Sequence, residues 1–170
     1  MASQPANADE SPFAYVYLTE VLPKGAMEVE QWASWSWKKP DEQFRQFKGR
    51  TEFEYGLTDR FQIAGYLNYS GKKIVPRGPG APDSAADEFD FDSVSFEGIY
   101  QVLNPFLDPV GLAFYVEPAI GNGKRELEFK MLLQKNFLDD RLIVAGNIIL
   151  EYEWEREPGE WEHESALEFY

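Results

Sequence analysis

The sequence predicts an all-β protein, built as an antiparallel up-and-down β-barrel of about eight strands. Three observations support this fold class. Apolar and polar residues alternate with a period of two through eight segments, as they do when a sheet has one apolar and one polar face. Clusters that contain Gly, Pro, Asn or Asp, which are turn-forming residues, separate successive segments. No segment shows helical periodicity.

The chain divides into three parts. Residues 1–10 form a polar tail that we expect to be flexible. Residues 11–25 predict a short strand and a turn that lead into the barrel, and residues 26–170 are the barrel domain. The clearest hairpin is 50–69, in which two alternating runs flank the turn 56–60. The strands are expected at 26–38, 43–56, 61–70, 91–103, 110–118, 125–135, 141–155 and 161–170.

The connections alternate between compact turns and longer polar loops. The compact turns 56–60, 104–109 and 136–140 all carry Asp. The longest loop is expected at 71–90, which is rich in Gly, Pro and Asp and should be exposed. Outer-membrane barrels pair short turns at one end with longer loops at the other.

The strands suit a membrane span, because they are between 9 and 15 residues long. The aromatic residues fall in two bands, which is typical of the two membrane interfaces. The loop-end band contains Trp35, Trp37, Tyr69, Trp154 and Trp161, and the turn-end band contains Tyr55, Phe61, Tyr100, Phe106, Phe137 and Phe169. We therefore expect a transmembrane barrel whose apolar face contacts lipid.

The N-terminal residues, the net charge and the absence of cysteine bear on where the protein is located and which partners it can bind. The first residues lack the basic and apolar regions of a signal peptide, so they are either a mature N-terminus or a cytoplasmic one. For a bacterial outer-membrane protein, we expect the signal peptide to have been removed. The net charge of -14 argues against nucleic-acid binding, because phosphate contacts need clustered Lys and Arg. The absence of cysteine excludes disulfides and cysteine-based metal sites.

Charged residues dominate the polar face, and this face would line the lumen. The lumen-lining candidates are Glu28, Glu30, Arg50, Glu52, Glu54, Glu97, Glu117, Glu128, Lys130 and Glu151. An eight-stranded barrel is only wide enough for its own side chains, whereas this many carboxylates require water. We therefore expect a hydrated lumen, with acidic groups at open rims or within a wider barrel. These charged residues form either a cation-preferring constriction or a network that only stabilises the barrel. The aromatic Tyr170 suits the last strand of a complete barrel, but it lies on the same face as Glu168, which suits a barrel domain that is incomplete at its C-terminus, and both alternatives stay open.

Two alternative sites carry little weight. His163 and Ser165 share a strand face, but no orienting acid or oxyanion hole accompanies them, so no catalytic residue is predicted. The acidic residues of the long loop match no calcium-binding spacing and are expected to be solvated. These residues are Asp83, Asp87, Glu88, Asp90 and Asp92. The sequence predicts no enzyme, metal or cofactor.

Lys72, Lys73 and Arg77 lie in the long loop and could contact lipopolysaccharide phosphates.

Several stretches resemble outer-membrane β-barrel proteins of Gram-negative bacteria that are loosely related to the meta-pathway phenol-degradation transporters. The resemblance spans about 13–170. It rests on the ordered stretches 22–25, 52–60, 108–112 and 117–118, together with Asn147 and Glu151. It implies a barrel that carries small molecules and has no catalytic motif.

The predicted function is a pore or transport component for small or cationic solutes, with the lipid bilayer as partner and the oligomeric state open. The alternative is a soluble lipocalin-like barrel that binds an apolar ligand, with the apolar face inside and the glutamates outside. Alternation alone does not decide which face is inside.

Overall fold

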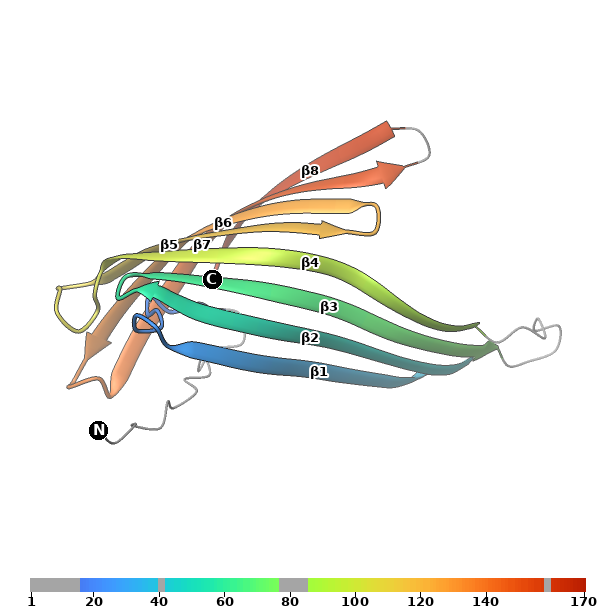
Figure 1. Ribbon diagram of the computed structural model, residues 1–170, viewed down its shortest axis with the longest axis horizontal. Coiled ribbons are helices and arrows are strands. Elements are labelled where there is room, and N and C mark those ends of the chain that lie inside the picture. Colours follow the sequence, from blue (N-terminus) through green and yellow to red (C-terminus); the bar gives the residue numbers. More distant parts are fainter. Residues whose placement is uncertain (1–15, 40–41, 77–85, 158–159) are drawn as a thin grey trace.

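The computed structural model describes residues 16–39, 42–76, 86–157 and 160–170. They form one sheet of eight antiparallel strands in chain order (Figure 1). The strands are β1 (Met27–Lys39), β2 (Glu42–Thr58), β3 (Phe61–Pro76), β4 (Ala86–Leu103), β5 (Gly111–Gly121), β6 (Lys124–Phe137), β7 (Leu142–Glu157) and β8 (Glu160–Phe169). The predicted all-β, up-and-down antiparallel architecture is confirmed. Within the described ranges no helix is long and apolar enough to cross a membrane.

The sheet curls strongly but is not closed. β1 and β8 lie at its two margins (Figure 1), and in the described part of the chain β1 pairs with β2 alone and β8 with β7 alone. The closed barrel that the sequence predicts is therefore not shown, and the described residues form an open sheet.

The long loop is shorter than the sequence predicts, because β3 and β4 continue into it. Lys72 lies opposite Glu88 and Lys73 opposite Asp87 in the register of these strands. Opposite charges on facing positions favour pairing, and they extend the hairpin beyond its apolar part. The connection that remains, 77–85, lies outside the described residues, as do Asp83 and Arg77.

The segment before β1 differs from its prediction. Residues 16–23 adopt no strand, so the strand expected within 11–25 is wrong for its described part. The predicted turn is present at Lys24 and Gly25, where Gly25 has a φ of 82°. This segment forms no strand because its main-chain groups bond to side chains of the sheet and not to the main chain of a neighbouring strand. We call residues 16–23 the strap.

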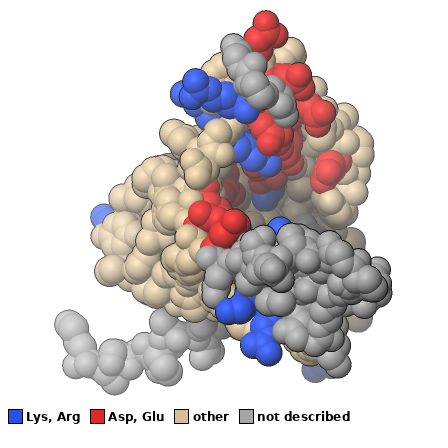
Figure 2. All heavy atoms as spheres, turned by 90° about the vertical axis from the view of Figure 1, so that its right-hand side faces the viewer, with Lys and Arg blue, Asp and Glu red and all other residues tan. Residues whose placement is uncertain are grey.

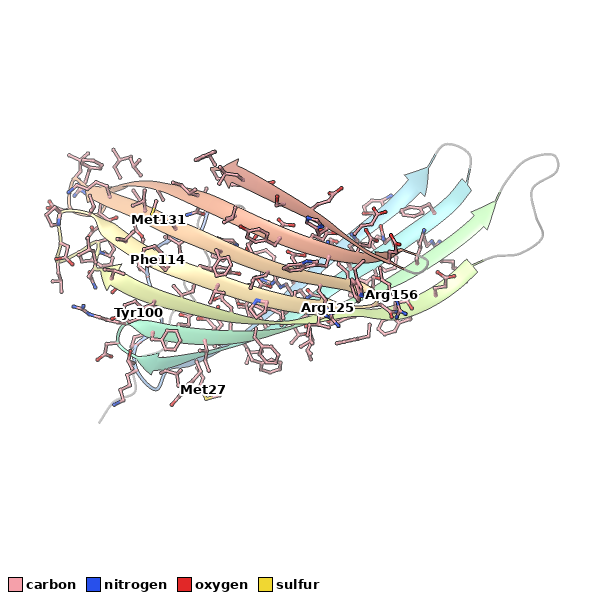
Figure 3. All side chains as sticks on the ribbon, turned by 90° about the horizontal axis from the view of Figure 1, so that it is seen from above. Met27, Tyr100, Phe114, Arg125, Met131 and Arg156 are labelled. Carbon is pink, nitrogen blue, oxygen red and sulfur yellow. The ribbon has the colours of Figure 1, made fainter. Side chains whose placement is uncertain are left out.

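The two faces of the sheet differ in the way that the alternation predicts. The outer face carries large apolar side chains that remain exposed, such as Phe96 (63%) and Phe114 (51%). Tyr100, Phe114 and Met131 form one row of this face on β4, β5 and β6 (Figure 3). The inner, concave face carries the polar side chains, and most of the buried residues lie on it. The core thus lies between the inner face and the strap.

Candidate functional site: the inner face of the sheet

Carboxylates gather on the inner face, in the part of the sheet between its turn end and its loop end. Seen from the loop end, acidic and basic side chains lie together around the hollow, and the left flank of the view is largely uncharged (Figure 2). We call this set the acidic belt: Glu52, Glu54, Glu97, Glu117, Glu126, Glu128 and Glu151. The strand register places like charges directly opposite one another, as in Glu117–Glu128–Glu151. Such pairs repel, so the belt is built at a cost in stability that a purely structural surface would not need.

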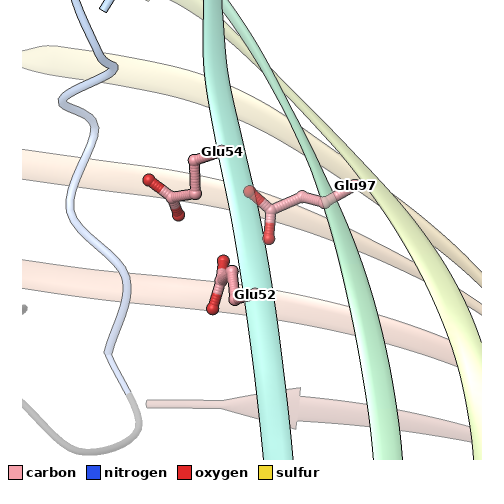
Figure 4. Close-up of side chains that lie close together, drawn as sticks. All are labelled: Glu52, Glu54 and Glu97. Atoms are coloured by element: carbon pink, nitrogen blue, oxygen red, sulfur yellow. The ribbon is translucent and has the colours of Figure 1, made fainter. Parts of the chain in front are cut away.

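Three carboxylates of the belt converge. Glu52 and Glu54 lie on β2 and Glu97 on β4, and one oxygen from each lies within 4.8 Å of the others. Figure 4 shows the three carboxyl groups directed toward one another. Glu97 is buried and accepts a hydrogen bond from the Tyr66 hydroxyl. Carboxylate oxygens are the ligands preferred by hard cations, so this arrangement attracts positive charge.

An ion pair spans the concavity. Arg50 on β2 lies 3.3 Å from the Glu117 carboxylate on β5, although two strands separate β2 from β5 in the sheet. Its guanidinium group also lies 3.8 Å from the centre of the Tyr66 ring. These contacts show how strongly the sheet is curled, because a flat sheet would hold these strands too far apart.

Among the residues whose burial the structure describes, Lys130 is the most enclosed cation of the inner face. Its side chain is 6% exposed, and its Nζ lies 2.6 Å from Glu128. The same Nζ lies 3.8 Å from the centre of the Tyr17 ring and 4.1 Å from that of Tyr115. Burial, followed by the charge of Glu97, raises the pKa of Tyr17, so the phenol stays neutral. Lys130 therefore joins the strap to the sheet by cation–π contacts.

Side-chain amides hold the strap across the turn end of the sheet. Asn147 on β7 accepts from Tyr17 N at 2.7 Å and donates to Tyr17 O at 2.9 Å. Gln134 on β6 accepts from Thr19 N at 2.9 Å. Gln101 on β4 donates to Thr19 O at 2.8 Å, and Gln62 on β3 accepts from Leu22 N at 2.7 Å. We call Gln62, Gln101, Gln134 and Asn147 the amide ladder, and the strap crosses their strands in order from β7 to β3.

Apolar contacts complete the seat of the strap. Tyr17 and Val21 pack against a buried cluster of Ile99, Ala113, Tyr115 and Leu132. Thr19 is fully buried. The strap therefore covers the apolar part of the inner face and leaves the acidic belt beyond it.

Gly111 on β5 makes room for the strap. A Cβ at this position would overlap Thr19 Oγ1 and would lie 3.0 Å from Pro105. We expect Gly111→Ala to lower the free energy of unfolding by about 1–3 kcal/mol, the cost of overpacking a filled site. Gly65→Ala is the matched control, since its Cβ would first meet Phe96 at 3.9 Å. Urea unfolding followed by tryptophan fluorescence measures both, and equal midpoints would contradict the close fit.

All ten lumen-lining candidates lie on the inner face, and the structure brings most of them into contact. Arg50 meets Glu117, Lys130 meets Glu128, and Glu151 approaches Glu126 and Glu128. Glu30 on β1 accepts a hydrogen bond from Trp32 instead. His163 and Ser165 are exposed on β8, opposite Trp154 and Tyr152.

The sequence reasoning missed the amide ladder and its partners on the strap. A signal existed, because an uncharged amide recurs on the polar face near each short turn. Gln62 follows the first turn, Gln101 precedes the second and Gln134 precedes the third. The glutamates are more numerous, but the amides make the specific hydrogen bonds with the strap.

Fold and site together define an all-β protein with a single curled sheet, an acidic inner face and an exposed apolar outer face. The chain belongs to a family of unknown function, DUF6662, whose sequence model matches residues 5–166. No curated protein and no solved structure matches the chain.

Proposed function

We propose that this protein is an outer-membrane β-barrel that forms a pore or transport component for small or cationic solutes. One observation carries the proposal: the sheet exposes its apolar face and buries its charged face. A water-soluble protein normally has the reverse arrangement. A bilayer favours this one, because lipid solvates the outer side chains and water the inner ones.

The aromatic residues support the same placement. Near the loop end, Trp35, Phe47, Tyr69 and Phe89 form a row across β1 to β4, with neighbouring ring centres 6.0–6.3 Å apart. Near the turn end, the Phe61 and Tyr100 rings lie 6.4 Å apart. An aromatic row near one end and an aromatic pair near the other fit two membrane interfaces.

Closure is part of the proposal. Open sheet edges do not occur in lipid, since their main-chain groups would lack hydrogen bonds. The strap and the belt already occupy the inner side, and an eight-stranded barrel has no room beyond its own side chains. We therefore propose that the edges of β1 and β8 pair with further strands in a wider barrel.

The soluble lipocalin-like alternative fits less well. It requires an apolar interior, but the inner face carries Glu52, Glu97 and Lys130 among its buried residues. Protein that stays soluble and monodisperse without detergent would favour this alternative and contradict the membrane proposal.

Conductance in planar bilayers tests the proposed function. We expect a cation-selective conductance, because carboxylates of the belt attract cations and repel anions. Glu52→Gln/Glu97→Gln should lower the cation-to-anion permeability ratio about fivefold, which corresponds to about 1 kcal/mol of lost electrostatic attraction. Reversal potentials in a salt gradient measure this ratio.

The control places the same change outside the belt. Glu160→Gln/Glu162→Gln removes two exposed charges of β8 and should leave the ratio unchanged. Anion selectivity in the parent protein, or equal shifts in both variants, would contradict the role of the belt.

A further inference from the structure

The amide ladder recognises the main chain of the strap. Its four side chains bind the N–H and C=O groups of Tyr17 and Thr19 and the N–H of Leu22. Main-chain recognition by spaced amides suits any extended peptide, because these groups are the same in every residue. The ladder thus has the chemistry of a peptide-binding site.

The strap is attached in a way that permits movement as a unit. In the described residues it forms no strand pairing, and its main chain is held through side chains of the sheet. A tight turn links it to β1, where Ala26 N donates to Pro23 O at 2.9 Å and Gly25 has a positive φ. Segments held by a few hydrogen bonds and a small apolar contact open at lower free energy than the sheet beneath them.

Release of the strap would change the inner face at its turn end. It would uncover the cluster around Ala113 and Leu132 and remove the Tyr17 ring from Lys130. The row that contains Lys130 lies next to the row of Glu117, Glu128 and Glu151. The path from the turn end to the acidic belt therefore passes through the position of the strap.

We propose that the amide ladder is a docking site for an extended peptide main chain, occupied here by residues 16–23, and that release of this strap opens the turn end of the inner face to solute. The opening step rests on the proposed pore function, whereas the docking step does not.

Thiol labelling of the full chain tests the docking step. The protein has no cysteine, so Thr19→Cys introduces a single thiol at a fully buried position of the strap. A water-soluble maleimide should react slowly with it in the folded protein. Adding Gln134→Leu/Asn147→Leu should speed the reaction about tenfold, because hydrogen bonds to the strap are lost and its released state becomes more populated.

Gln46→Leu is the matched control, since Gln46 lies on the inner face of β2 near the loop end, opposite Lys72. It should leave the labelling rate unchanged. Circular dichroism checks that the sheet persists in each variant. A rate that is equal in the ladder and control variants would overturn the docking step.

Conductance during labelling tests the opening step. A bulky maleimide on the introduced thiol prevents the strap from returning, so the conductance should rise as labelling proceeds. Faster labelling with a steady, nonzero conductance would overturn the opening step. A lack of conductance in every variant would overturn the pore function instead, and the labelling rates would still decide the docking step.

Discussion

Phe96→Arg is expected to destabilise the membrane-inserted protein by about 2–4 kcal/mol, the cost of a cationic side chain on the lipid face near the bilayer midplane. Phe96 lies on the outer face of β4, opposite Gly65 on β3, and is 63% exposed. In water the same substitution would alter an exposed residue and change the stability by less than about 0.5 kcal/mol. The two environments therefore predict different results for one variant.

Phe106→Arg is the matched control for this prediction. Phe106 is similarly exposed, at 53%, but it lies in the turn between β4 and β5. Near the interface an arginine costs only about 0–1 kcal/mol, because its side chain reaches the headgroups. Urea unfolding from lipid vesicles compares the two variants. If both change stability equally little, the outer face does not contact hydrocarbon.

The alternation of the sequence predicted much of this fold, because burial in a sheet acts on every second residue. The predicted start of a strand at Phe61 and the predicted end of a strand at Leu103 agree with the structure. Turn-forming residues precede the first position and follow the second. The prediction of a loop over 71–90 was wrong, because oppositely charged residues at facing positions, such as Lys72 and Glu88, extend the hairpin. Such pairs cannot be identified without knowing the strand register. Deciding which face of the sheet is the inner one required the curvature of the sheet, which composition does not determine.

The candidate site was predicted unevenly for a related reason. Alternation predicted that Glu52 and Glu54 share a face, but their convergence with Glu97 depends on the register, in which Ala64 lies between Glu54 and Glu97. The ion pair of Arg50 with Glu117 joins strands that are not neighbours, so no local pattern encodes it. The strap resembled a strand in composition, and only its long-range contacts with amides such as Asn147 reveal its role.

Lys130→Met is expected to lower the free energy of unfolding by about 3–5 kcal/mol, the usual cost of removing one partner of a buried ion pair. The Lys130 ammonium group lies between the Tyr17 and Tyr115 rings and pairs with Glu128. Methionine fills a similar volume but leaves the Glu128 carboxylate without its cation in a site that is 16% exposed. The loss also frees Tyr17, so this variant should weaken the seat of the strap.

A double-mutant cycle separates the buried charge from the packing. In Lys130→Met/Glu128→Gln no unpaired charge remains, so this protein should be more stable than Lys130→Met alone. Lys124→Met on the same strand is the control, because Lys124 pairs with Glu153 at 2.7 Å but is 45% exposed, and its loss should cost less than about 1 kcal/mol. If Lys130→Met and Lys124→Met unfold at the same urea concentration, Lys130 is hydrated in the folded protein and does not anchor the strap. A large difference would instead place the Lys130 contacts among the main interactions that hold the strap against the sheet.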